Sequence, residues 1–315
     1  MADSMILRLH APCGADPLEL LKRVLTAVVL IPIVLLLVLR APVPVLAFVA
    51  GVVALLAIHE LLKLAEGYNI RPLYKPTSIF GASFFLLIAI SPAQTPALST
   101  SGFAFVGVCA AALAPFLFLV MAMRRDELSS AFPAAMLAAF AFSYIALPMA
   151  SLVQLREQWQ GSFFILYLLL LVWAGDIFAY FIGKSLGTHR MSPRVSPKKT
   201  WEGAVASVVA SVAVGMLMAH YAVPISRILL HARLIEQRDG VFTEPAMFSM
   251  VILSVLLNIA AQLGDLVESV IKRGAGAKDS GALLPGHGGM FDRIDALLFA
   301  APVLWAYMAW RVLMQ

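Results

Sequence analysis

The sequence has little charge and almost no cysteine. Aspartate, glutamate, lysine and arginine make up only 13% of its 315 residues, whereas 61% are hydrophobic. Mean hydropathy is +0.90. Soluble domains use about 45–50% apolar residues, so an ordinary soluble domain is excluded. The two cysteines, Cys13 and Cys109, supply neither a disulfide framework nor a metal knuckle. The composition predicts an integral membrane protein.

Apolar stretches long enough to cross a bilayer recur along the chain. A membrane-spanning helix needs about 20 predominantly apolar residues. Such stretches lie near residues 24–40, 42–62, 77–92, 103–123, 131–152, 162–183, 203–222, 246–271 and 294–314. The third is the shortest, because Pro92 and Pro96 follow it closely. We predict an all-α, polytopic membrane bundle of about nine transmembrane helices.

The first apolar run is expected to be a retained span. Lys22 and Arg23 precede it as they would in a signal peptide, but the run ends in Arg40 and Pro42 without a small-residue cleavage site. Pro17 is typical of the first turn of a helix, so this helix is expected to begin there, before it enters the membrane.

The positive charges predict an orientation. If the spans alternate across the membrane, most of the 23 lysines and arginines fall on the side of the amino terminus. Positively charged loops stay in the cytoplasm. We therefore expect the amino terminus and the loops 184–202 and 273–293 in the cytoplasm, and residues 223–245 and the carboxyl terminus on the other side.

The span at 246–271 ends in a stripe of ionisable side chains. Asp265, Glu268, Ser269 and Lys272 are spaced i, i+3, i+4 and i+7, so a helix places them on one face. Charge is costly in lipid, so this face is expected to meet the bundle interior or a water-filled cavity. The alternative is an interfacial cap in which Lys272 and Arg273 reach the membrane surface and Glu268 only pairs with one of them.

The segment 278–295, KDSGALLPGHGGMFDRID, concentrates charge and glycine beside the last span. Asp292 and Asp295 lie one helical turn apart and, with Asp265, form a candidate metal site. Oxygen ligands suit Mg²⁺, which binds one or two carboxylates and completes its shell with water and phosphate oxygens. The same site has room in this prediction for a second cation. The segment also contains residues suited to phosphate binding: Lys278, His287, Gly288, Gly289 and Arg293. The glycines alone would favour a plain turn at the membrane edge.

Asp176 lies inside the otherwise apolar run 162–183, with Trp173, Tyr180 and Gly183 at helical spacing around it. An ionisable residue within a span is a candidate for substrate binding. The alternative is a buried carboxylate that bonds Tyr180 or a serine of a neighbouring helix.

The loop at 184–203 carries five lysines and arginines. Ser196 followed by Pro197 predicts the start of a helix, which would put Lys198 and Lys199 in its first turn beside free backbone amides. That arrangement suits a phosphate. The alternative is a basic anchor at the cytoplasmic surface.

The run SVIKRGAGAKDSGALLPGHGGMFDRID, residues 269–295, resembles the signature of the phosphatidate cytidylyltransferase (CDP-diacylglycerol synthase) family. The matching positions are Ser269, Lys272, Arg273, Lys278, Asp279, Ser280, Pro285, His287, Gly288, Gly289, Asp292, Arg293 and Asp295. The segments GDLVES, SPKKTWEG and DIFAY are also similar. The resemblance therefore covers the chain from about residue 170 onward, and we divide it into five motif-free spans (1–160) and a catalytic region of four spans (161–315).

The resemblance implies an enzyme that makes CDP-diacylglycerol and pyrophosphate from CTP and phosphatidic acid with a divalent metal. It also implies a homodimer in the bacterial inner membrane, with a site open to the cytoplasm and the bilayer, and no nucleic-acid partner. The expected catalytic residues are Asp265, Lys272, Lys278, Asp279, Asp292, Arg293 and Asp295, of which Asp265, Asp292 and Asp295 bind the metal. The expected substrate-binding residues are Asp176, Lys198, Lys199, Ser269, Arg273, His287, Gly288 and Gly289. Asp279 either adds a metal ligand or orients Lys278, and His287 is expected to donate a hydrogen bond.

Two other functions are compatible with carboxylates and lysines at a membrane surface. A CTP-dependent polyprenol kinase would direct attack to the γ phosphorus instead of the α phosphorus. An ion-coupled transporter would use Asp176 and Asp265 as ion ligands, but no inverted repeat is present. The CDP-alcohol phosphotransferases are excluded, because their paired DxxDG and GxxxDxxxD segments are absent.

Overall fold

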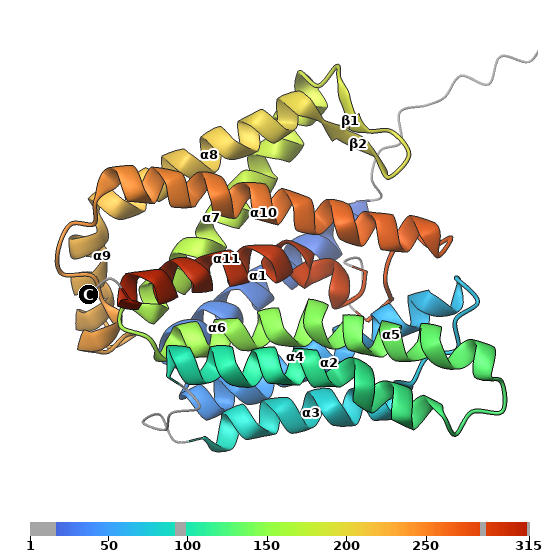
Figure 1. Cartoon of the computed structure of the whole chain (residues 1–315). Helices are drawn as coiled ribbons and strands as arrows, with labels where there is room; N and C mark the ends of the chain where they lie inside the picture. Colours follow the sequence, from blue (N-terminus) through green and yellow to red (C-terminus); the bar gives the residue numbers. More distant parts are fainter. Residues whose placement is uncertain (1–16, 92–98, 284–287, 314–315) are drawn as a thin grey trace, which may run out of the picture.

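The computed structural model describes residues 17–91, 99–283 and 288–313, with the side chains of 17–27 and 313 left out. The chain is a bundle of helices with one small hairpin (Figure 1). In lipid every backbone N–H and C=O must be paired within the protein, and helices achieve this within one segment. Six helical runs of the described chain are long and apolar enough to cross a membrane: Val43–Glu66, Thr100–Ala122, Leu128–Glu157, Gly161–Ser185, Trp201–His220 and Met247–Gly274. The protein is a multi-pass membrane protein.

The first half of the chain contains α1 (Pro17–Arg40), α2 (Val43–Glu66), α3 (Tyr74–Ile90), α4 (Thr100–Ala122), η1 (Leu128–Ser130), α5 (Ala131–Ala141), the π-helical turn η2 (Phe142–Ala146) and α6 (Leu147–Glu157). The second half contains α7 (Gly161–Ser185), β1 (Arg190–Ser192), β2 (Ser196–Thr200), α8 (Trp201–His220), α9 (Ala222–His231), η3 (Gln237–Asp239), α10 (Met247–Gly274) and α11 (Phe291–Leu313). Each predicted span falls mostly on described helices, the span 131–152 on α5, η2 and α6 together. The predicted spans 24–40, 77–92 and 294–314 lie on α1, α3 and α11, which are not among the six runs above.

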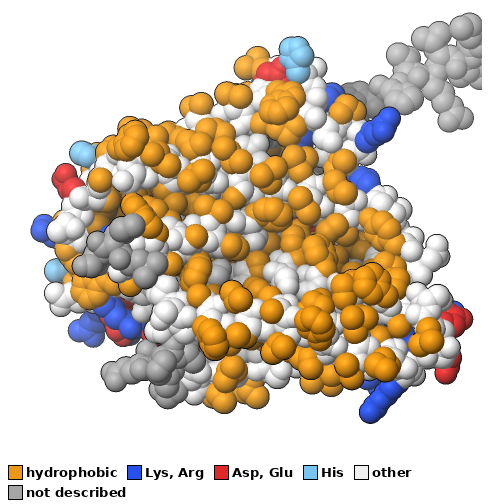
Figure 2. Space-filling view, in the orientation of Figure 1, with side chains coloured by type: hydrophobic (Ala, Val, Ile, Leu, Met, Phe, Trp, Pro, Cys, Tyr) orange, Lys and Arg blue, Asp and Glu red, His pale blue; other side chains and the backbone are white. Residues whose placement is uncertain are grey.

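Two hydrophobic cores hold the bundle together. The first is formed by α2 to α6 and the start of α11, through Phe291, Ile294 and Leu298. The second is formed mainly by α7, α10 and the rest of α11. Helix α11 therefore joins both cores, and Figure 1 shows it running beside α10. Figure 2 shows hydrophobic side chains over most of the visible face and charged ones gathered at the helix ends, as a lipid-facing surface requires.

The loop before α8 differs from the prediction. Ser196 and Pro197 do not start a helix; they belong to β2, which pairs antiparallel with β1. The helix begins at Trp201, and the Thr200 hydroxyl caps it by accepting a hydrogen bond from the Gly203 amide at 3.2 Å. A proline is tolerated in such a two-stranded ribbon, because its missing N–H can face away from the partner strand. The cap at Thr200 supplies the start signal that Ser196 was expected to supply.

Candidate active site

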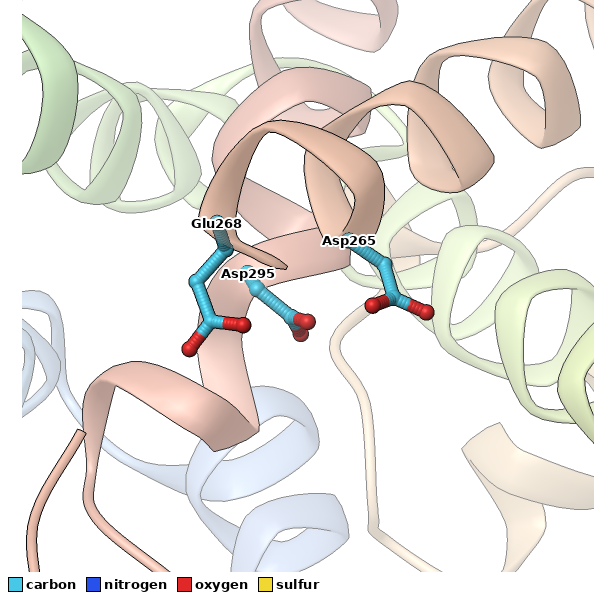
Figure 3. A group of neighbouring side chains, drawn as sticks. All are labelled: Asp265, Glu268 and Asp295. Carbon is cyan, nitrogen blue, oxygen red and sulfur yellow. The ribbon is translucent and has the colours of Figure 1, made fainter. Parts of the chain in front are cut away.

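Three carboxylates meet where α10 and α11 pack together. Asp265 and Glu268 of α10 and Asp295 of α11 each offer an oxygen atom, and these atoms lie within 4.8 Å of one another (Figure 3). The helices approach closely at Gly264, where a Cβ atom would collide with the carbonyl oxygen of Asp295. We call Asp265, Glu268 and Asp295 the acidic cluster.

The acidic cluster has the chemistry of a site for a divalent cation. Its donor atoms are all carboxylate oxygens, which hard cations such as Mg²⁺ prefer. Glu268 is only 1% exposed, and its Oε1 has no hydrogen-bond partner in the described part of the chain. A buried carboxylate oxygen is rarely left without a partner. Lys272 Nζ contacts the other oxygen, Oε2, at 2.5 Å. Oε1 therefore remains available for a ligand.

Asp292 lies beside the acidic cluster but has other partners. Its Oδ1 accepts a hydrogen bond from Lys272 Nζ at 2.6 Å, and its Oδ2 accepts from the amides of Ser280 and Gly289 at 2.9 and 2.8 Å. The Ser280 hydroxyl lies 2.9 Å from the same oxygen and 2.9 Å from Glu60 Oε2, so its one hydrogen goes to either carboxylate. The arrangement thus brings Glu268, rather than Asp292, together with Asp265 and Asp295. Asp292 holds the 278–295 segment against α10 through Lys272, and its role as a metal ligand stays a prediction.

A cavity of about 660 Å³ opens next to the acidic cluster, within the size range of small-ligand sites. Its walls come from α7, the hairpin, the start of α8 and α10. Its polar lining residues include Asp176, Tyr180, Lys184, Arg190, Lys198, Lys199, Ser207, Gln262 and Asp265. Asp265 belongs to both the cavity and the acidic cluster, so the two adjoin each other at this side chain.

The predicted basic residues enter the site from the hairpin. Lys199 Nζ pairs with Asp265 Oδ2 at 2.7 Å, and Lys198 lines the same cavity. On α10, Arg273 Nε donates to the carbonyl of Val195 at 3.3 Å and so fastens the hairpin turn. The two lysines therefore reach the site from a strand, without the helix amino terminus that the sequence predicted.

The remaining predicted residues are spread around this centre. Ser269 Oγ donates to Asp265 Oδ1 at 3.5 Å, which confirms that both share one face of α10. Lys278, Asp279 and Arg293 are exposed. Gly288 has a positive φ of 78°, a conformation that favours glycine. His287 lies outside the described residues.

Glu60 of α2 contacts the 278–295 segment beside the acidic cluster, which the sequence did not lead us to predict. Its carboxylate, in a residue only 8% exposed, accepts hydrogen bonds from the amides of Met290 and Phe291 at 3.0 and 2.8 Å and lies 2.9 Å from the Ser280 hydroxyl. It thereby caps the start of α11, where a negative charge is favourable. A single acidic residue in an apolar span was the available signal, because such residues rarely lie in spans without a role.

Known proteins with similar sequences identify the family of this chain. The model of the cytidylyltransferase family matches residues 21–310. A phosphatidate cytidylyltransferase of Brucella abortus is 38% identical over 213 residues, which cover 68% of this chain and 66% of that protein, just under two thirds of its length. Those of Haemophilus influenzae and Staphylococcus haemolyticus are 36% identical over 169 residues (52% of this chain, 54% of that protein) and 30% identical over 282 residues (90% and 96%). The family match spans nearly the whole chain, both cores included, and the chain belongs to the cytidylyltransferase family.

Proposed function

We propose that this protein is a phosphatidate cytidylyltransferase, which converts CTP and phosphatidic acid into CDP-diacylglycerol and pyrophosphate. The observation that carries the proposal is the acidic cluster, which borders a cavity lined by four lysines and arginines at the end of a membrane bundle. Relatives of that name align with the chain over 68% and 90% of its length.

The reaction joins two polyanions. An oxygen of the phosphatidate phosphate attacks the α phosphorus of CTP, the bond from that phosphorus to the oxygen bridging to the β phosphorus breaks, and pyrophosphate leaves with the electron pair. A phosphate monoester is largely ionised at neutral pH, so the attack requires no general base. The work of the protein is to neutralise charge and to align the reacting groups.

The side chains of the site suit these tasks. Lys184, Arg190, Lys198 and Lys199 line the cavity and bind CTP phosphates. Asp265, Glu268 and Asp295 would hold a divalent cation, for which we take Mg²⁺. Such a cation would lower the negative charge around the reacting phosphates. Lys272 sits between Glu268 and Asp292, 2.5 and 2.6 Å from their oxygens, and sets the position of both carboxylates.

In this proposal the site faces the cytoplasm of a bacterium and the protein acts as a homodimer in the inner membrane. The basic loops 184–202 and 273–293 support that orientation. The resemblance of residues 269–295 to the family signature supports the dimer. Residues 161–315 form the catalytic region, and residues 1–160 support it from one side through the first hydrophobic core and through Glu60.

Radiolabelled CTP tests the proposal. Purified protein in mixed micelles with phosphatidic acid and Mg²⁺ is expected to move label from the α phosphorus of CTP into lipid and to release pyrophosphate. Label that enters lipid only from the γ phosphorus would instead identify a CTP-dependent lipid kinase. Absence of both transfers, in protein that remains monodisperse, would refute the proposed function.

A further inference from the structure

A chain of hydrogen bonds runs from the buried interface of α7, α8 and α10 to the cavity. It begins at Ser211, whose Oγ donates to the carbonyl oxygen of Leu171 at 2.9 Å. A hydroxyl has one hydrogen, so Ser211 Oγ can only accept from its other neighbour, Asn258, at 2.8 Å. The Asn258 atom that faces Ser211 is therefore the amide nitrogen, Nδ2.

The amide orientation of Asn258 in turn fixes that of Gln262, which lies one helical turn further along α10. Asn258 Nδ2 gives its second hydrogen to Ser207 Oγ at 2.8 Å, so Asn258 Oδ1 is left to accept from Gln262 Nε2 at 2.6 Å. The carbonyl of Ala204 accepts the other hydrogen of Gln262 Nε2 at 3.3 Å. A carbonyl can only accept, so two independent contacts give Gln262 the same orientation. Both of its amide hydrogens are used, and its Oε1 remains as an acceptor.

This acceptor belongs to a side chain that lines the cavity, one helical turn from Asp265. Ser207 and Asn258 are each 1% exposed, so a flipped amide would leave a buried polar group unpaired, at a cost of about 1–3 kcal/mol. We propose that Gln262 Oε1 is a specificity-determining acceptor for the nucleoside part of CTP. It would bind the exocyclic amino group of the base or a ribose hydroxyl. This inference rests on the proposed function, in which CTP occupies the cavity.

The chemistry of the two substrates favours the nucleoside. Phosphatidic acid presents phosphate and ester oxygens, which are acceptors and would be repelled by a fixed carbonyl oxygen. The triphosphate of CTP likewise presents only acceptor oxygens. The cavity groups that suit it are the basic side chains of Lys184, Arg190, Lys198 and Lys199. Hydrogen-bond donors are found on the cytosine amino group and the ribose. A site built to bond such a donor discriminates against analogues that lack it.

Calorimetric titration of the purified protein in detergent tests the inference independently of turnover. The probes are CTP, UTP, 2′-deoxy-CTP, 3′-deoxy-CTP and inorganic tripolyphosphate, which has no nucleoside. Gln262→Met keeps a side chain of similar length and removes the acceptor. We expect this change to weaken CTP binding roughly tenfold, the worth of one hydrogen bond, and to leave tripolyphosphate binding unchanged. The analogue that lacks the bonded group should be insensitive to the change, which separates the amino group (UTP) from the two hydroxyls.

Two further variants separate this contact from a packing effect. Asn258→Leu leaves Gln262 in place but removes the shorter of the two contacts that orient its amide, so it should weaken CTP binding by a smaller factor and spare tripolyphosphate. Ser254→Ala is the matched control, because Ser254 is a buried α10 residue that bonds Tyr167 at 2.7 Å and lies outside the chain to the cavity. It should change neither affinity.

The inference is overturned if Gln262→Met leaves CTP binding unchanged, if it weakens tripolyphosphate equally, or if CTP and all three analogues lose the same factor. A wild-type protein that binds no CTP and releases no pyrophosphate would refute the proposed function itself, and so give a different result.

Discussion

The helices of residues 1–160 and those of residues 161–315 are stabilised in different ways. The first set is held mainly by apolar packing. Fully buried alanines such as Ala47 and Ala54 let neighbouring helices approach closely, and the ring of Phe80 packs edge to face against those of Phe118 and Phe142. The second set adds buried hydrogen bonds, including the chain from Ser211 to Gln262. Polar groups inside a membrane bundle are costly unless paired, so the paired polar groups beside the cavity support the proposed binding region.

Glu60 is an exception to this difference. It belongs to residues 1–160, yet its carboxylate lies between Gly281 and Gly289, where a Cβ atom on either glycine would collide with it. Residues 1–160 thus contribute a carboxylate that holds the segment from which Asp292 and Asp295 extend. Four changes would break or sharpen the comparison between the halves.

The largest effect is expected from the acidic cluster. Asp295→Asn removes one charge from the group that would hold the cation, and turnover should fall roughly 100-fold or more, as when a charge-stabilising group is removed from an active site. The measurement is phosphatidate-dependent pyrophosphate release. Asp126→Asn, an exposed aspartate after α4, is the control and should keep full activity. Near-normal turnover in Asp295→Asn would remove this residue from the site.

Glu60→Ala should come next. The substitution leaves the amides of Met290 and Phe291 without their side-chain acceptor, each at a cost of about 1–3 kcal/mol, while the Ser280 hydroxyl keeps Asp292 as an acceptor. We expect kcat to fall more than KM for CTP rises, because the segment of Asp292 and Asp295 loses its anchor. Glu66→Gln on the same helix, which disturbs only a contact with Tyr74, should behave as wild type. If both variants were equally active, the first half would be a scaffold alone.

A smaller, selective effect is expected at the hairpin. The double change Lys198→Ala with Lys199→Ala removes two cavity cations, one of them paired with Asp265, and should raise KM for CTP roughly tenfold. Initial rates at varied CTP measure it, with the exposed residue Lys75→Ala as control. An altered expression level with unchanged KM would favour the alternative that these lysines only anchor the loop.

The last test leaves activity unchanged and examines orientation. Single cysteines at the exposed positions Thr188 and Glu244, in a background without Cys13 and Cys109, should respond differently to a membrane-impermeant thiol reagent. Glu244→Cys should be labelled in intact cells, and Thr188→Cys only after the membrane is opened, because the positive loops stay in the cytoplasm. Labelling of Thr188→Cys from outside would reverse the proposed topology.

Much of the bundle was predictable, because a span of apolar residues in lipid has few alternatives to a helix. The polar face of α10 was predictable from helical spacing alone, and the contacts from Ser269 to Asp265 and from Lys272 to Glu268 confirm it. The helix start predicted at Ser196 was wrong. The helix begins after Thr200 instead, because residues 196–200 pair with 190–192 as strands, and sequence spacing does not reveal such pairing.

The sequence by itself determined that the chain crosses a membrane and where most of its long helices lie, because composition and local periodicity control these properties. Only the tertiary structure decided which carboxylates meet. Close packing of the two helices at Gly264 brings Glu268 beside Asp295. Asp292 instead bonds Lys272 and Ser280, and Glu60 contacts Ser280 from a helix more than 200 residues away in sequence. Such contacts depend on the three-dimensional packing of helices, which no local pattern specifies.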